Sequence, residues 1–288
     1  MGPVDLRTLG QSGLRVSAIG LSTAQWGQRV ALDATPGILK AFLDAGGNLV
    51  DVASPGAFRE IRGSVSLREV VLSAASGVNP ALPAGRRVNC SRRALLNDLD
   101  ALLAELGVEH LDLWSVAYWD PHTPVDEVCG ALDHAVTTGR VRYAGVRDYS
   151  GWQLAATHAR RGVVAAQVPY SLLVREAELE VMPAAEYLGV GIIAADPLAH
   201  GVLTGQMAPD DPHAPRLGGQ RAGKISEALR TAAEGLGISA ATAAVAWVRQ
   251  RQAVASTLVE ARDREDIRRC MQARLPGPIQ KALDDISR

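Results

Sequence analysis

Short apolar runs alternate with longer amphipathic stretches along most of the chain. Apolar runs of four to eight residues have the length of buried strands, and we find candidates at 17–22, 47–51, 69–73, 111–116, 141–146, 163–168, 190–195 and 254–259. Stretches with apolar residues at helical spacing lie at 35–45, 91–106, 124–138, 150–161, 178–188, 238–251 and 263–273. Apolar strands that alternate with helices predict a parallel sheet covered on both faces.

Eight candidate strands, each followed by a longer stretch, favour a sheet that closes into a barrel. The chain has no Gly-x-Gly-x-x-Gly loop, which is the phosphate-binding signature of an open dinucleotide-binding sheet. We therefore expect an α/β fold, a (β/α)8 TIM barrel that residues 1–288 form as a single domain. Residues 6–9 and 14–17, on either side of a Gln-Ser-Gly turn, predict an N-terminal β-hairpin before the first barrel strand.

Two segments interrupt the alternation. Residues 54–68 contain one proline and two glycines and leave little room for a full crossover helix, and residues 208–223 are rich in Gly and Pro and predict a loop over the barrel mouth. Helix ends carry their own signals. Ser91 is placed to cap the helix that follows it, and Gly107 and Gly189 stand where two helices are expected to end.

Composition and charge narrow the class of protein. The formal net charge of −1 argues against a dedicated nucleic-acid binder. Cys90, Cys129 and Cys270 form no Cys-x-x-Cys pair, which argues against a zinc ribbon or a thioredoxin-type site, and such scattered cysteines fit a reducing compartment. No apolar run approaches the ~20 residues that a membrane span needs. We expect a cytoplasmic protein with no membrane, nucleic-acid or metal partner.

Several stretches resemble the aldo-keto reductase family, in the family's order and over nearly the whole chain. They are LGQSGLRVSAIGLSTAQWG (9–27), GGNLVDVAS (46–54), LDLWSVAYWDPHTP (111–124), GRVRYAGVRDYSGWQL (139–154), QVPYSLL (167–173) and GVGIIAADPLAHGVLTGQ (189–206). The resemblance implies the same barrel that the alternation predicts. It also implies a site at the carboxyl ends of the strands, where barrel enzymes place their chemistry.

The family reduces carbonyl groups by hydride transfer from NADPH, with a Tyr as proton donor, a Lys and an Asp that tune it, and a His that orients the substrate. Asp51 matches the Asp. The positions that match the Tyr, the Lys and the His are Gly56, Ala75 and Ala117. These side chains have no proton to give, and a positioned general acid contributes ~10²–10⁴-fold to rate. Standard carbonyl reduction is therefore not expected from this divergent member.

Parts of the family's cofactor site are retained by resemblance. Gln167 matches the residue that holds the nicotinamide carboxamide, and Tyr170 matches an aromatic residue that stacks on the ring. Leu198 falls in the pyrophosphate loop, and Arg262 matches a place used for the 2′-phosphate. These four residues are the expected cofactor contacts if NADP(H) binds.

Other positions depart from the family's cofactor site. Arg147-Asp148 replaces a Ser-Asn pair that holds the carboxamide, Asp196 replaces a Ser, and Glu260 replaces a Gly of the last phosphate loop. Two like charges ~4 Å apart repel by roughly 1–4 kcal/mol at effective dielectric constants of 80 to 20. The residues therefore favour no cofactor, with NADP(H) as an alternative.

Four polar residues are the candidate catalytic groups at the barrel mouth: Asp51, Arg147, Asp148 and Asp196. Carboxyl groups with displaced pKa values can do acid–base work, and Arg147 is a candidate partner for the carboxylate of Asp51. The alternative is a salt-bridge network that only closes the site. Three aromatic residues are candidate walls of a substrate pocket: Trp26, Tyr118 and Trp119.

Three functions are compatible with this pattern. The first is a non-redox enzyme of specialised metabolism, which cyclises, isomerises or eliminates a group from a small organic molecule. The second is an NADP(H)-dependent oxidoreductase with a non-standard proton donor, either Tyr118 or water. The third is a non-catalytic binding or scaffold protein, because the short segment 54–68 exposes barrel surface to a protein partner. Fold alone does not choose among them.

Overall fold

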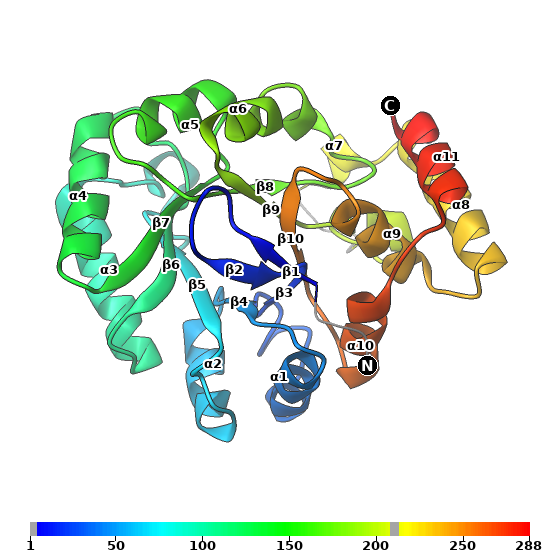
Figure 1. Cartoon of the computed structure of the whole chain (residues 1–288), viewed down its shortest axis with the longest axis horizontal. Coiled ribbons are helices and arrows are strands. Elements are labelled where there is room, and N and C mark those ends of the chain that lie inside the picture. The colour runs from blue at the N-terminus through cyan, green and yellow to red at the C-terminus, as the bar shows by residue number, and fades with distance from the viewer. Residues whose placement is uncertain (1–4, 208–212) are drawn as a thin grey trace.

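The computed structural model describes residues 5–207 and 213–288 and shows a closed barrel of eight parallel strands (Figure 1). The strands are β3 (Ile19–Ser22), β4 (Leu49–Asp51), β5 (Val71–Ser76), β6 (Leu111–Val116), β7 (Val141–Arg147), β8 (Ala165–Pro169), β9 (Gly191–Ala195) and β10 (Val254–Val259). They follow one another around the barrel in chain order, and β10 pairs with β3 to close it. The predicted (β/α)8 barrel is confirmed, and each strand overlaps its predicted range.

Helices surround the barrel (Figure 1). Seven of them fall on predicted ranges: α1 (Thr35–Asp44), α3 (Arg92–Leu106), α4 (Val125–Thr137), α5 (Gly151–His158), α6 (Val181–Leu188), α9 (Ala240–Arg249) and α10 (Arg264–Gln272). The Ser91 hydroxyl accepts the backbone N–H of Ala94 at 3.3 Å, as its capping role requires. Gly107 and Gly189 end α3 and α6 with φ of 62° and 70°, a conformation that glycine adopts without strain.

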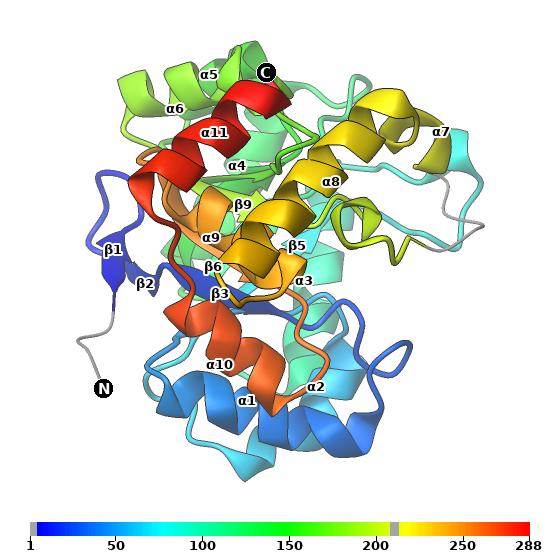
Figure 2. The same cartoon turned by 90° about the vertical axis from the view of Figure 1, so that its right-hand side faces the viewer.

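Four further helices were not predicted. The crossover after β4 holds only the short α2 (Pro55–Ile61), in keeping with the little room expected there. The loop predicted at 208–223 is wrong for its described part, because α7 (Ala214–Leu217) and the start of α8 (Gln220–Gly235) occupy it; residues 208–212 lie outside the described residues. The last helix, α11 (Gly277–Ser287), packs beside α8 (Figure 2).

The predicted hairpin is present as β1 (Leu6–Thr8) and β2 (Arg15–Ser17), which pair antiparallel. Its turn lies against the start of β9, since the backbone N–H of Gln11 donates to the Gly189 carbonyl at 2.7 Å. Gly10 and Gly191 allow this close approach: a Cβ on Gly191 would lie 2.5 Å from the Gly10 nitrogen. The hairpin therefore packs at the amino-terminal end of the barrel strands.

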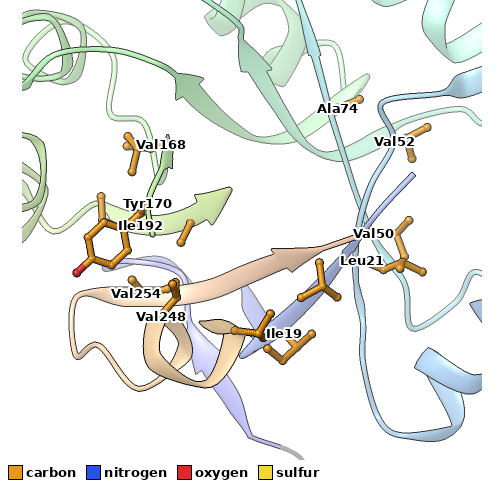
Figure 3. Close-up of a cluster of buried hydrophobic side chains, with 14 of the residues drawn as sticks. Ile19, Leu21, Val50, Val52, Ala74, Val168, Tyr170, Ile192, Val248 and Val254 are labelled. Atoms are coloured by element: carbon orange, nitrogen blue, oxygen red, sulfur yellow. The ribbon is translucent and has the colours of Figure 1, made fainter. Parts of the chain in front are cut away.

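Alternation along the strands decides which side chains reach the barrel mouth. Leu49 on β4 and Ala165 on β8 belong to the apolar cluster inside the barrel. Their neighbours Val50 and Ala166 pack outward in the larger cluster between strands and helices, part of which Figure 3 shows. Because successive strand residues point to opposite faces, Asp51 at the end of β4 points back inside.

Among the residues that the structure describes, no single helix is long and apolar enough to cross a membrane. The helices α8 and α9 meet the length and composition criteria only as a pair, and they are bent by 99° relative to each other.

Candidate functional site

A cavity of about 720 Å³ opens at the carboxyl ends of the barrel strands. Its floor includes Asp51 from β4, Arg147 from β7 and Gln167 from β8, and it extends past the loops after β9 and β10 to Arg262 and to Cys270 on α10. Of the eleven residues proposed for the site, Asp51, Arg147, Asp196, Gln167, Leu198 and Arg262 line this cavity.

Arg147 and Asp51 form a buried ion pair across the floor of the cavity. One guanidinium nitrogen of Arg147 lies 2.5 Å from one carboxylate oxygen of Asp51, and the other lies 3.3 Å from the second oxygen. The side chain of Asp51 is only 4 % exposed and that of Arg147 14 %. A paired geometry of this kind fixes the plane of the guanidinium. The partnership expected from the sequence is therefore present.

The positions that match the family's Tyr, Lys and His follow or lie in β4, β5 and β6, which are neighbours in the barrel. Gly56 lies in the first turn of α2, Ala75 in β5, and Ala117 directly after β6. Arg147 also lies 3.4 Å from the Ser73 hydroxyl on β5. A guanidinium from β7 thus neutralises the Asp51 carboxylate, and no lysine is needed on β5 for this purpose.

The loop after β9 carries Asp196 in an unusual backbone conformation. Asp196, Ala199 and His200 have φ between 50° and 53°, and Gly201 has φ of 86°. The Asp196 carboxylate accepts the backbone N–H of His200 at 2.8 Å and lies 3.2 Å from the His200 ring nitrogen. Non-glycine residues with positive φ are uncommon and cluster at functional sites. The contacts of the Asp196 carboxylate with His200 hold the loop in this conformation.

Glu260, directly after β10, lines the same cavity. Its side chain is exposed to the cavity. The protein atoms around the carboxyl group partly desolvate it, and this desolvation, together with the nearby carboxylate of Asp196, raises the pKa of Glu260. A carboxyl group with a raised pKa is a stronger base when it is ionised. From its sequence position Glu260 was expected only to repel phosphate. Its place at the carboxyl end of a barrel strand was the signal that it would line this cavity.

Asp148 does not join the cavity. Its backbone turns to φ of 51°, and its side chain lines a separate hollow of about 270 Å³ with Glu180 and Arg216. Burial raises the pKa of the Asp148 carboxyl, and a hydrogen bond from Tyr118 opposes this. The expected four-residue cluster therefore splits: Asp51, Arg147 and Asp196 share one cavity, and Asp148 sits beside it.

Tyr170 is not a cavity residue, which corrects its proposed contact with nicotinamide. Its ring is fully buried and stacks on Trp247 of α9 with ring centres 5.5 Å apart. Its hydroxyl donates to Glu178 at 2.5 Å. The ring lies among outward-facing core residues (Figure 3).

The three aromatic residues proposed as pocket walls also lie away from the large cavity. Trp26 is 2 % exposed and stacks on Phe58 of α2, so its side chain belongs to the core. Trp119 packs edge-on against Trp152, with ring centres 5.0 Å apart, and Tyr118 is 45 % exposed beside Asp148. Of the two aromatic residues after β6, Trp119 thus packs on the start of α5 and Tyr118 stays half exposed.

Fold and site together define a barrel protein with a deep cavity at the catalytic end of its strands. A family model described as Aldo/keto reductase family matches residues 18–281, and the chain belongs to this family. It is 30 % identical to the "Uncharacterized oxidoreductase YrpG" of Bacillus subtilis (strain 168), over 96 % of this chain and 94 % of that protein. It is also 30 % identical to the L-glyceraldehyde 3-phosphate reductase of Escherichia coli O157:H7, over 94 % and 88 %.

The family implies NADP(H), and the residues of this cavity do not fit it. The Arg147 side chain crosses the floor to Asp51, where the resemblance places the nicotinamide carboxamide contacts. Asp196 and Glu260 set negative charge along the expected course of the pyrophosphate. Within the described part of the chain, no three His, Cys, Asp or Glu side chains form a group suited to a metal ion.

Proposed function

We propose that the protein catalyses proton transfer on a small organic molecule in the large cavity, as an isomerase, a lyase or a cyclase. One observation carries this proposal. Arg147 and Glu260 line one cavity. The guanidinium of Arg147 is held by a buried carboxylate, and the carboxyl group of Glu260 has a raised pKa. The positions of the family's proton donor and its partners are Gly56, Ala75 and Ala117, none of which has an ionisable group.

The two groups have complementary roles in such a reaction. The N–H groups of Arg147 stabilise negative charge that develops on a carbonyl oxygen when a neighbouring C–H bond loses its proton. Asp51 holds the guanidinium in position for this. Glu260 takes the proton from carbon and returns it, because a raised pKa makes its carboxylate a stronger base. Asp196 contributes by raising that pKa.

Proton exchange with solvent tests the proposal before the natural substrate is known. Small ketones, hydroxyketones and aldehydes are incubated with the protein in D₂O without nicotinamide, and loss of the protons beside the carbonyl group is followed by ¹H NMR. We expect accelerated exchange for at least one compound. Glu260→Gln is expected to slow this exchange by ~10²-fold or more, and Arg147→Lys by a similar factor, since lysine lacks the planar fork.

Glu265→Gln is the matched control, because Glu265 is an exposed acid on α10 that does not line the cavity. It is expected to retain the full exchange rate. Exchange that is equally fast in Glu260→Gln would show that the proposal is wrong. So would NADPH consumption with a carbonyl compound that shows no exchange without cofactor.

That last outcome would establish the second candidate, an NADP(H)-dependent oxidoreductase with a non-standard proton donor. The relatives named as oxidoreductase and reductase favour it, as does the position of Gln167, Leu198 and Arg262 in the cavity. Calorimetric titration with NADPH and NADP⁺ separates the two. The scaffold alternative stays a prediction, tested by co-purification of a stoichiometric protein partner.

A further inference from the structure

We infer that carboxylates of this chain occupy the anion-binding groups along the large cavity, so that the cavity selects a ligand without phosphate groups. The inference does not depend on the reaction proposed above. It rests on three places where an N–H or a guanidinium near the cavity is already bonded to an internal acid.

The first place is the loop after β9. Turns that combine left-handed residues direct successive backbone N–H groups into a concave nest that suits an anion. Here the N–H of His200 donates to both carboxylate oxygens of Asp196, at 2.8 and 3.1 Å. The N–H groups of Ala199, Gly201 and Val202 donate to backbone carbonyls. A carboxylate of the protein therefore holds the position that a phosphate of a ligand would take.

The second place is the amino-terminal end of α10. Such an end attracts anions because its first N–H groups lack partners and the helix dipole is positive there. In this chain the carboxylate of Asp263 accepts the N–H groups of Glu265 and Asp266, each at 2.8 Å. Two of the first N–H groups of this helix are thus satisfied from within the chain.

The third place is the cation at the far end of the cavity. Arg262 donates to the carboxylate of Asp266 at 3.1 Å and to the side-chain oxygen of Gln206 at 3.1 Å. Asp266 also accepts from Arg269 at 2.7 Å. Because Arg262 already has an acidic partner, it offers less to an incoming phosphate than a cation without one.

Charge along the cavity agrees with these contacts. The lining contains three arginines, and four acids: Asp51, Asp196, Glu260 and Asp266. Two of the acids, Asp196 and Glu260, lie close enough that the charge of one raises the pKa of the other. A pyrophosphate would add further negative charge beside them. A neutral or cationic small molecule meets no such repulsion.

Gain of binding is the sharpest test. NADP⁺ is titrated calorimetrically into the wild type, into Asp196→Gly/Glu260→Gly, and into Asp196→Asn/Glu260→Gln. Glycine tolerates the positive φ at 196 and frees the His200 N–H, and the amide variant removes charge but keeps shape. We expect no binding by the wild type up to about 1 mM and at least about tenfold tighter binding by the glycine variant.

Glu265→Gln/Asp285→Asn is the control for net charge, since both residues are exposed and neither lines the cavity. It is expected to behave as the wild type. If the glycine variant does not fold, the amide variant decides, and it too should bind NADP⁺ more tightly than the wild type.

Micromolar binding of NADP⁺ by the wild type would overturn the inference and support the oxidoreductase candidate. No gain of binding in a folded variant would also overturn it. That second result leaves the solvent-exchange experiment unaffected, so failure here is distinguishable from failure of the proposed function.

Discussion

Asp51 and Arg147 illustrate how a retained residue and a substituted one depend on each other in one site. Asp51 is almost fully buried, and a buried carboxylate without a partner is costly. In this chain the partner comes from the strand three positions further around the barrel, and its long side chain spans the distance between β7 and β4. The ion pair thus gives the Asp51 carboxylate the cationic partner that a lysine provides in the family pattern.

Arg147→Met is expected to destabilise the protein by about 3–5 kcal/mol, because it leaves the Asp51 carboxylate buried and unpaired. Urea denaturation at neutral pH measures the change. The double variant Asp51→Leu/Arg147→Met is the matched control: removing both charges restores most of the stability, since paired burial of ions gives little net gain over apolar packing. A single variant as stable as the wild type would contradict this account.

Glu260 gives the stability a distinctive pH dependence. Burial, and then the Asp196 carboxylate, raise the pKa of Glu260 in the folded protein. Between the pKa values of the unfolded and the folded states, the folded protein holds a proton that the unfolded chain has released, so wild-type stability falls as pH rises through this window. Glu260→Gln does not titrate. We expect its stability relative to the wild type to increase as the pH rises above about 4.3, the ordinary pKa of a glutamate.

The comparison of denaturation curves at several pH values checks this, because titrations at other sites cancel in the difference between the two proteins. Glu265→Gln, at an exposed position on α10, should show no such trend. A difference that is flat with pH would mean that Glu260 titrates alike in the folded and unfolded states.

Some residues of the site could be predicted from the sequence and others could not. Asp51, Arg147 and Asp196 directly follow or end apolar strand runs, and strand ends point into the mouth of a barrel. Tyr170 and Trp26 lie in loops beyond the strands, where alternation no longer fixes direction. Their rings are drawn into the core by Trp247 and Phe58, which are distant in sequence.

The hairpin of β1 and β2 and the start of β9 are joined by contacts that only glycine allows. A Cβ at Gly191 would lie 2.5 Å from the Gly10 nitrogen and 2.7 Å from a Leu9 side-chain carbon. Since the first of these atoms belongs to the backbone, a rotamer change cannot relieve the overlap.

Gly191→Ala is therefore expected to lower the free energy of unfolding by about 2 kcal/mol or more. Gly223→Ala is the control, because Gly223 lies inside α8 with open space around it. Alanine there should stabilise the protein by about 0.5–1 kcal/mol through helix propensity. Thermal or chemical denaturation measures both, and equal effects of the two substitutions would contradict the role given to the close contact.

The last helix, α11, is held by a network around one carboxylate. Asp284 pairs with Arg175 at 2.9 Å and with Arg251 at 3.0 Å, and both guanidinium groups lie over the ring of Trp247. The nearby arginines lower the pKa of Asp284 against the effect of its burial. The network therefore contributes stability at neutral pH that is lost as pH falls through the lowered pKa.

Asp284→Asn is expected to cost about 1–3 kcal/mol at neutral pH, because charge-assisted hydrogen bonds are lost from two partly buried arginines. Hydrogen–deuterium exchange of α11 should accelerate at the same time. Asp285→Asn, at the adjacent exposed position, is expected to change neither quantity. Loss of stability in both variants would show that net charge, and not this network, matters.

The strands were easier to predict than the last helices. The barrel strands are short and mostly apolar, whereas α8 buries only Ala222, Ile225, Leu229 and Ala233 in an otherwise polar stretch. The Gly and Pro residues before it indicate a loop, although the helix begins among them. Similarly, α11 starts at a Pro-Gly-Pro run, and proline fits the first turn of a helix because that turn lacks internal N–H partners.

The two ends of the barrel carry different groups of polar residues. The hairpin and the polar contacts of Asn48 lie at the amino-terminal end, where Asn48 accepts the Ser17 N–H at 2.7 Å and donates to the Arg15 carbonyl at 3.0 Å. The large cavity lies at the other end, with Glu260 on its wall. In barrel enzymes the carboxyl ends of the strands carry chemistry and the opposite ends carry stability.

Two substitutions, one at each end, test whether this division holds here. Asn48→Ala removes a partner of two backbone groups and is expected to lower the free energy of unfolding by about 1–3 kcal/mol. Well below the melting temperature, the rate at which this variant exchanges substrate protons with solvent is expected to equal that of the wild type. Glu260→Gln is expected to abolish most of that exchange without loss of stability at neutral pH, because the carboxylate it removes is unfavourably placed near Asp196. If Asn48→Ala slowed exchange as much as Glu260→Gln does, the chemistry would depend on the whole barrel and not on the cavity.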